Sequence, residues 1–417
     1  MMRIFLFCLC WCCSNLLAAQ PTIYASTRAT ERQKLEGDLR QKIDNILQSP
    51  LDAQTESAWL EALWAMELMQ IKSRKIAKAL YKQVLFHYPH QNLEAQRQSL
   101  ETVYGLYPHT FQKSIAQLIK VEKNPKLFAM MVHYLYRTKE RKSIQALAQE
   151  LLQKNLSNYT NHPIIFCLKQ DLEKNRQQRL KERPPLEDLL QHPFPEMPWV
   201  FFSFQRLNRD FPGLTIIRHP DGQFERDSSG QLFQVPQLAR AVSNLPGYLT
   251  NGNTPQGILS ILEITTTDNQ YIGPTEMLNM VLPYEVPLST FYHQASVASN
   301  EENAYRQLLP LSWQSYFPIW EAYYAGKAGR TEIFAHGTTI NPQFYAGAPY
   351  FPNTPSLGCL TASELWNPQT GQLEKSDQHR LIEKMQKLGV LRGYFVVVEI
   401  DDQNKAVSLE EIENLIK

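Results

Sequence analysis

The sequence predicts an α+β protein of more than one domain, in which an N-terminal all-α helical array is followed by a β-rich domain. Glycine usage is the first observation, because only Gly37 and Gly105 of the 17 glycines precede residue 200. The first half is rich in helix-forming Leu, Ala, Gln, Lys and Glu, whereas the second half combines glycine, proline and β-branched residues, as strands and turns do. A length of 417 residues also exceeds one ordinary core, so two domains are expected.

Residues 1–19 are predicted to be a secretory signal peptide. Arg3 precedes an apolar-dominated run, residues 4–17, that closes on Ala18 and Ala19 and is too short to span a bilayer well. A buried N-terminal helix and a lipoprotein-type cysteine are the alternatives. The prediction implies a secreted or periplasmic protein associated with the cell envelope.

Four of the six cysteines fall inside this segment, so the mature chain would keep only Cys167 and Cys359. Two free thiols are expected in preference to a disulfide between them. Cys167 lies in an apolar run and is interpreted as a small core residue. The formal net charge of +1 gives no reason to expect a nucleic-acid partner. The sequence has neither zinc-ligand spacing nor a phosphate-binding loop, so no metal or cofactor is expected.

Residues 20–182 are predicted to form the helical array, as a series of short antiparallel helix pairs. Apolar residues recur there at helical spacing in three sets. The sets are Leu35, Leu39, Ile43, Ile46 and Leu47; Trp59, Leu60, Leu63, Met66 and Leu68; and Ile76, Leu80, Val84 and Leu85. His90 and His109 are interpreted as surface residues at helix ends, with a metal pair as the alternative. The array is expected to be a scaffold or a surface for a cell-wall protein partner.

Residues 183–198 carry repeated prolines and are predicted to be a short, stiff linker. The β-rich domain is expected over residues 199–417. Strands are expected at residues 199–204, 257–266 and 393–400, and a hairpin is expected from residues 214–219 and 223–226. An aromatic helical insertion is expected over residues 302–325.

A histidine and a cysteine that flank a proline-rich loop carry the candidate chemistry. A short apolar strand, residues 333–335, leads directly to His336, and Cys359 follows Gly358 at the end of the loop. A cysteine attacks as its thiolate and needs a base or a cation nearby, so we expect His336 to act as the base. Gly358 would let the backbone approach a substrate closely, with the Cys359 N–H facing an oxyanion, and Ser356 would position either partner.

Three motifs resemble the catalytic domain of the L,D-transpeptidase (YkuD-type) family. His336-Gly337-Thr338 is similar to the HG(T/S) strand end of that family. The run S-L-G-C, residues 356–359, is similar to its S-H-G-C motif. The run TNGNTPQGIL, residues 250–259, resembles the TP-x-G strand start found upstream in the family. The resemblance covers roughly residues 199–401.

The resemblance implies a β-sandwich-like, L,D-transpeptidase-like catalytic domain in which Cys359 is the acyl-accepting nucleophile and His336 its base. Family members act on peptidoglycan stem peptides, cutting after the L-centre of diaminopimelate and passing the acyl group to a second amine. Such chemistry cross-links or remodels the cell wall and so bears on cell shape. The candidate substrate-binding residues are Gly337, Thr338, Tyr345, Tyr350 and Thr361, with core packing as the alternative for the two tyrosines.

The sequence departs from the family pattern at two positions. Leu357 replaces the histidine of S-H-G-C, and Thr361 replaces the arginine or asparagine two residues after the cysteine. A branch of the family with S-(I/L)-G-C includes hydrolases that release groups attached to peptidoglycan. The sequence therefore leaves three alternatives, which are a transpeptidase, a hydrolase of the same family, and a peptidoglycan-binding scaffold with a decayed site.

Overall fold

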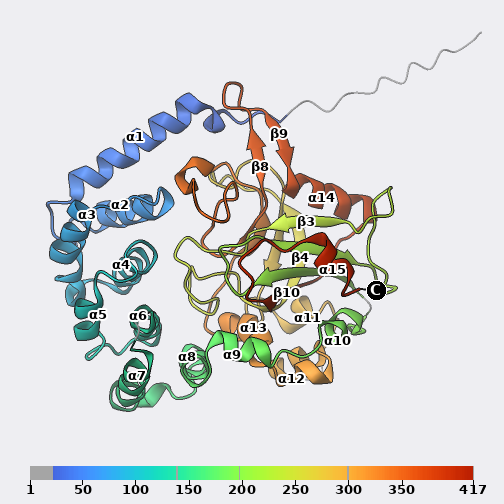
Figure 1. Ribbon diagram of the computed structural model, residues 1–417, viewed down its shortest axis with the longest axis horizontal. Helices are drawn as coiled ribbons and strands as arrows, with labels where there is room; N and C mark the ends of the chain where they lie inside the picture. The colour runs from blue at the N-terminus through green and yellow to red at the C-terminus, as the bar shows by residue number, and fades with distance from the viewer. Residues whose placement is uncertain (1–21, 138–139, 197, 298–299, 417) are drawn as a thin grey trace, which may run out of the picture.

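The computed structural model describes residues 22–137, 140–196, 198–297 and 300–416 (Figure 1). It confirms a mixture of helices and strands, with the first eight helices forming an arc beside a body that contains the sheet. The predicted signal peptide, residues 1–19, lies outside the described residues. None of the helices in the described ranges combines the length and apolar character needed to cross a bilayer.

The arc consists of helices in two layers, and its members pack in the order α1–α2, α2–α4, α4–α6 and α6–α8. Its helices are α1 (Ala29–Ile46), α2 (Glu56–Leu68), α3 (Arg74–Ala79), α4 (Leu93–Leu106), α5 (Gln112–Leu118), α6 (Pro125–Tyr136), α7 (Arg141–Asn155) and α8 (Pro163–Glu173). Figure 1 shows α2, α4 and α6 on the side of the arc that faces the sheet. The three helical sets predicted from apolar spacing are confirmed, in α1, in α2, and in α3 with the π-helical turn Leu80–Leu85 that follows it.

Side-chain caps explain where several of these helices begin. The side chain of Asn92 accepts a hydrogen bond from the Ala95 N–H at the start of α4, and Asn124 caps α6 in the same way. Pro125 and Pro163 occupy the first helical positions, where a missing N–H costs nothing. Cys167 is fully buried in α8, which confirms its interpretation as a core residue.

Eight strands form one mixed sheet with the order β3-β2-β1-β10-β4-β5-β6-β7. They are β1 (Trp199–Arg206), β2 (Gly213–Arg218), β3 (Gln234–Gln237), β4 (Gly257–Thr265), β5 (Met277–Val281), β6 (Ile333–His336), β7 (Leu360–Thr361) and β10 (Gly393–Asp401). Strands β8 (Glu364–Trp366) and β9 (Leu373–Ser376) form a separate hairpin. The pairs β1–β10 and β6–β7 are parallel and the other pairs of the large sheet are antiparallel.

The ends of the large sheet meet, so a β-sandwich-like arrangement is not what the structure shows. Leu238 follows β3 and exchanges two backbone hydrogen bonds with Thr361 of β7, at 2.8 and 3.0 Å. The sheet therefore nearly closes into a barrel, which leaves few unpaired strand edges. Both faces are buried, since Phe201 packs in one apolar cluster and its neighbour Phe202 in another. Burial on both faces explains why β1 and β10 are almost continuously apolar.

The remaining helices lie after the arc and pack around the sheet. They are α9 (Arg176–Lys181), α10 (Leu186–Gln191), α11 (Leu288–Phe291), α12 (Glu301–Gln307), α13 (Glu321–Lys327), α14 (Asp377–Leu388) and α15 (Leu409–Glu413). The proline-rich residues 183–198 contain α10, and Leu189, Leu190 and Phe194 of this segment are buried in the apolar cluster that covers one face of the sheet. The segment thus packs as part of the core, because its leucines recur at helical spacing between the prolines.

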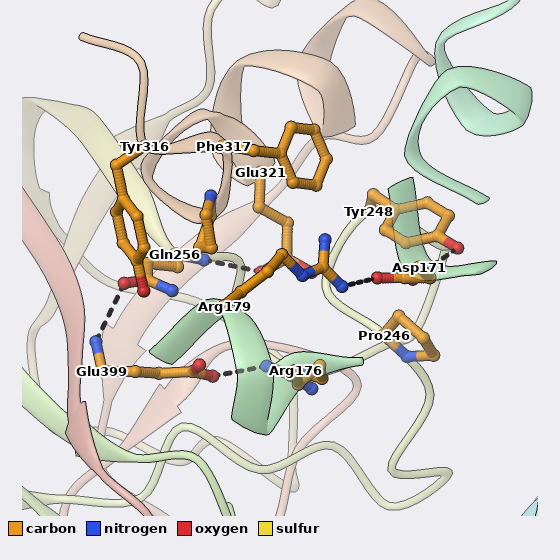
Figure 2. Close-up of a pocket in the computed structure, with 11 residues that line it drawn as sticks. Asp171, Arg176, Arg179, Pro246, Tyr248, Gln256, Tyr316, Phe317, Glu321 and Glu399 are labelled. Carbon is orange, nitrogen blue, oxygen red and sulfur yellow. Dashed lines mark hydrogen bonds and ion pairs between the residues drawn. The ribbon is translucent and has the colours of Figure 1, made fainter. Parts of the chain in front are cut away.

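The arc of helices is attached to the rest of the molecule at both ends. At its start, Ile23 bridges to Gln372, and the Tyr24 N–H donates to the Gly371 carbonyl at 2.8 Å. At its end, a largely buried network of charged side chains joins α8 and α9 to β10 (Figure 2). Arg176 and Arg209 both bind Glu399 there, and Arg179 binds Asp171.

Candidate active site

The residues predicted to carry the chemistry meet at a cavity of about 240 Å³. Cys359, His336, Ser356, Thr338 and Thr361 all contribute to its wall. Its other lining residues are Trp64, Glu67, Leu68, Val242, Asn269, Tyr271, Ile272, Glu332, Phe334, Ile340, Pro355 and Leu357. The cavity is therefore bounded by the strands β6 and β7 on one side and by helix α2 on another.

Strand geometry explains why the thiol and the imidazole share this cavity. In the parallel pair β6–β7, Ala335 lies opposite Leu360 and His336 lies opposite Thr361. Successive side chains alternate between the faces of a strand, so Ala335 points to the core while His336 points to the cavity. Cys359 precedes Leu360, and its Sγ accepts a hydrogen bond from the Phe334 N–H at 3.4 Å. Cys359 thus lies level with Phe334, two residues before His336 along β6, and both side chains line the cavity.

Cys359 is a half-buried thiol with an elevated pKa. Burial raises the pKa of Cys359 to about 11, against the opposing effects of the Phe334 N–H and of the Arg330 guanidinium. Arg330 is itself buried and donates to the carbonyl oxygens of Asn253 at 2.8 Å and Gly252 at 2.7 Å. Arg330 is thus the cation that acts on the thiol, and its guanidinium packs against Gly358 of the cysteine loop.

Gly358 makes this close approach of Arg330 possible. A Cβ at residue 358 would lie 2.0 Å from the guanidinium, and its φ of +125° is one that L side chains rarely adopt. The carbonyl of Gly358 accepts a hydrogen bond from the Thr254 hydroxyl at 2.9 Å. The upstream T-P-x-G motif, in which Thr254 stands, is therefore in direct contact with the cysteine loop.

His336 is buried and uncharged at neutral pH. Burial lowers the pKa of His336 to about 4, although the Gly337 carbonyl, 2.5 Å from Nδ1, favours the protonated form. A carbonyl oxygen can only accept, so Nδ1 carries the hydrogen and Nε2 is left as the basic nitrogen. The side chains of His336 and Cys359 make no hydrogen bond to each other in the part of the chain that the structure describes. The pair shares a cavity as a neutral imidazole and a neutral thiol.

Ser356 supports the turn before the cysteine. Its hydroxyl donates to the Cys359 carbonyl at 2.8 Å and accepts from the Gly358 N–H at 3.0 Å. The Gly358 N–H is thereby engaged within the loop. Ser356 positions the backbone of the S-L-G-C run and makes its contacts with that backbone.

Gly337 and Thr338 follow the histidine and pack against Glu364, and of these two only Thr338 lines the cavity. A Cβ on Gly337 would lie 2.2 Å from the Glu364 carboxyl carbon, and the Thr338 N–H donates to that carboxylate at 2.9 Å. The Thr361 hydroxyl donates to the Thr354 carbonyl at 2.7 Å, so this threonine ties the loop to β7 as well as lining the cavity.

The two loop tyrosines lie elsewhere. Tyr345 and Tyr350 are buried and pack against each other and Leu238, away from the residues that line the cavity. Leu357, which stands where the family pattern has histidine, is 49% exposed and lines the cavity. The structure therefore brings together the thiol, the imidazole and an apolar side chain at the position of the missing histidine.

Four residues at the site were not predicted from the sequence. Arg330 comes from the turn before β6, Tyr271 from the loop before β5, and Trp64 and Glu67 from helix α2. Trp64 packs edge-on against Tyr271, with ring centroids 5.0 Å apart. Residues 64, 67 and 68 share one face of α2, but helical spacing alone could not show what that face contacts.

The elevated pKa of Cys359 predicts slow alkylation at neutral pH. Because only the thiolate reacts, the rate of Cys359 modification by iodoacetamide is expected to rise about tenfold for each pH unit between pH 7 and pH 10, while the pH stays below the pKa. Cys167 is fully buried, and burial raises its pKa well above the ordinary value, so it provides an internal control that stays unmodified in the folded protein. A rate that levels off near pH 7 would contradict the expectation.

The composition of the site suits acyl-transfer chemistry. Within the described ranges, no group of three or more His, Cys, Asp or Glu side chains is arranged to hold a metal ion. The cavity wall holds the Cys359 thiol, the His336 imidazole and two carboxyl groups, those of Glu67 and Glu332. Hydroxyl and amide side chains (Asn269, Tyr271, Thr338, Ser356 and Thr361) and apolar side chains make up the rest. A scan against protein-family models and searches of curated proteins and of solved structures found no match to this chain.

Proposed function

We propose that this chain is an exported cysteine-dependent acyltransferase of the L,D-transpeptidase type, which acts on peptidoglycan stem peptides through an acyl-enzyme at Cys359. The observation that carries the proposal is the shared cavity, which is lined by His336 of β6 and by Cys359, the residue directly before the parallel strand β7. The similarity of the H-G-T and S-L-G-C motifs to those of the family supports the same reading. In this proposal residues 199–417 form the catalytic domain and the helical array, residues 20–182, supports it, with its outer layer left for a cell-wall protein partner.

The protonation states suggest the order of events. At neutral pH the thiol keeps its proton and the imidazole is neutral, so proton transfer to Nε2 of His336 accompanies attack of Sγ on the substrate carbonyl. A C–S bond forms, the C–N bond of the donor peptide breaks, and the imidazolium returns its proton to the leaving amine. The positive charge of Arg330, whose guanidinium packs against Gly358, stabilises the sulfur when the sulfur carries negative charge.

A hydrolase remains the second candidate, and Leu357 favours it. An apolar side chain at this place supplies no hydrogen bond to a second peptide, whereas water needs no such contact to attack the thioester. The two candidates share the acyl-enzyme and differ only in the acceptor.

Covalent labelling tests the acyl-enzyme. Incubation with a carbapenem-type acylating probe is expected to add the mass of one probe, and peptide mapping should place it on Cys359. The matched control is Cys167→Ala, which removes the only other cysteine of the described chain and should label fully. An unlabelled protein, or a label on any other residue, would refute the proposed function.

Digestion of purified sacculi separates the two acceptors. A transpeptidase is expected to create new cross-linked peptides, whereas a hydrolase releases attached peptide or protein without forming them. Neither product, from a protein that also fails to acylate, would favour the scaffold alternative.

A further inference from the structure

Helix α2 of the helical array forms one wall of the cavity that contains Cys359. Trp64, Glu67 and Leu68 line it, and their spacing of three and four residues places them on a single helical face. Trp64 packs on Tyr271, and Arg32 of α1 donates to the Thr339 carbonyl at 2.9 Å, so the array is held against the loops beside the cavity. The substrate-facing surface is therefore completed by a part of the chain outside residues 199–417.

Glu67 is the unusual member of this wall, because it is a carboxylate with only 3% of its surface exposed. Its Oε1 accepts from the Gln98 side-chain amide at 2.8 Å and from the Thr102 hydroxyl. Both donors are neutral and lie on α4. The nearby cation, Arg97, binds Glu94 and Glu101 instead. Among the described residues, no Lys, Arg or His forms an ion pair with Glu67.

A buried carboxylate without a cation is costly, and the protonation of Glu67 reflects this. Burial, followed by repulsion from Glu101, raises the pKa of Glu67 to about 8. An incoming cation would offset both effects, since it would supply the opposite charge inside a cavity with little competing water. The remaining wall is mainly apolar, with Leu68, Phe334 and Ile340 among its members, and suits an aliphatic chain.

We propose that Glu67 binds a primary ammonium group on an aliphatic chain of the substrate, so that the helical array selects what reaches Cys359. Glu332 also lines the cavity, but its side chain is exposed, and an exposed charge attracts a cation weakly because solvent screens it. The ammonium belongs to either the acyl donor or the amine acceptor. The reaction at Cys359 rests on the proposed function, but binding at Glu67 can be measured without it.

Binding is tested in the Cys359→Ala protein, in which no chemistry can occur. Calorimetric titration at pH 9, where Glu67 with its pKa of about 8 is mainly ionised, compares diaminopimelate with pimelate. Pimelate has the same carbon chain and no ammonium groups. Diaminopimelate is expected to bind about tenfold tighter or more, and Glu67→Gln should remove that preference, since an ion pair of this kind is worth at least about 1.4 kcal/mol, which is tenfold in affinity. Glu332→Gln, in the same cavity, and Glu61→Gln, on the exposed side of α2, are the matched controls and should keep the preference.

Loss of the preference in Glu332→Gln but not in Glu67→Gln would overturn the proposal, as would equal affinity for the two ligands before any substitution. Glutamine keeps an oxygen for Gln98 and Thr102, and thermal melting checks that the variant folds. If it does not, Glu67→Asp, which keeps the charge but shortens its reach, replaces it and should weaken diaminopimelate more than pimelate.

Two kinetic measurements on the unsubstituted protein, the rate of acylation and the rate of loss of the acyl group, show whether the ammonium belongs to the donor or to the acceptor. If the ammonium is the acceptor's, diaminopimelate speeds loss of the acyl group. In that step the ammonium gives one proton to Glu67, the nitrogen attacks the thioester carbonyl, a C–N bond replaces the C–S bond, and the second proton passes through His336 to the thiolate. If the ammonium belongs to the donor, diaminopimelate slows acylation and leaves the loss of the acyl group unchanged.

If diaminopimelate binds but changes neither rate, its site lies away from Cys359 and the proposal is refuted. Absence of any acylation counts against the proposed function alone.

Discussion

Replacing Cys359 with alanine is expected to abolish acylation by a carbapenem-type probe, and replacing His336 with alanine is expected to slow it by about 100- to 10,000-fold. The thiol has a pKa of about 11, so little thiolate exists at neutral pH unless a base removes the proton during attack. His336 is the basic group on the same face of the sheet, with Nε2 unprotonated. Stopped-flow or intact-mass measurement of the acylation rate at pH 7 gives the comparison.

Two controls make the histidine result specific. His90→Ala changes an exposed histidine at the end of a helix and should leave the rate unchanged. Added imidazole should restore part of the rate to the His336→Ala protein, because it can enter the space left by the side chain and act as a base, whereas it should not rescue Cys359→Ala. An unchanged rate in His336→Ala would show that another group removes the thiol proton.

Replacing Glu399 with alanine is expected to lower the free energy of unfolding by about 3–5 kcal/mol, the usual cost of removing one partner from a buried ion pair. Glu399 is 3% exposed, and its Oε1 accepts from Arg209 at 3.0 Å and from Arg176. The buried guanidinium of Arg209 and the partly exposed one of Arg176 would then lose their carboxylate, and Figure 2 shows Arg176 beside Glu399. Urea unfolding, followed by circular dichroism and by tryptophan fluorescence, measures the loss.

The matched control for this network is Glu302→Ala. Glu302 pairs with Arg306 at 3.0 Å on the surface, with both side chains at least 40% exposed, and such pairs contribute less than about 1 kcal/mol. If Glu399→Ala destabilised the protein no more than Glu302→Ala, the expectation would be wrong, and the charged network would be exposed to solvent or rearranged in solution. A loss seen by fluorescence alone would show that the array detaches while the sheet stays folded.

Much of the fold could be predicted because it depends on local periodicity. The strands expected over residues 199–204, 257–266 and 393–400 are present as β1, β4 and β10, and the aromatic segment 302–325 is helical in large part. The hairpin around Asp221 is also confirmed, with Gly222 at φ +90° and a 2.8 Å hydrogen bond from the His219 N–H to the Gln223 carbonyl. In each case the pattern that predicted the element lies within a few neighbouring residues.

Features that join distant parts of the chain could not be predicted in this way. Closure of the sheet depends on Leu238 pairing with Thr361, which no local pattern reveals. The site shows the same division. Cys359 and His336 could be found because each stands at a motif, whereas Glu67 is one glutamate among many and reaches the cavity only through the packing of α2. Tyr345 and Tyr350 were predicted to bind substrate but lie in a core instead. An aromatic residue in a loop can line a groove or fill a core, and the sequence does not distinguish the two.

The attachment of the helical arc at both ends restricts how the cavity can open. A cover fixed at one end can swing about a hinge, but α2 lies between the bridge at Ile23 and the ion pairs at Glu399. Its displacement from Cys359 must therefore occur by shear, in which packed helices slide over one another in small steps spread along the arc. Substrate size at this site would then be set by how far α2 can slide on α1 and α4, the two helices that pack against it.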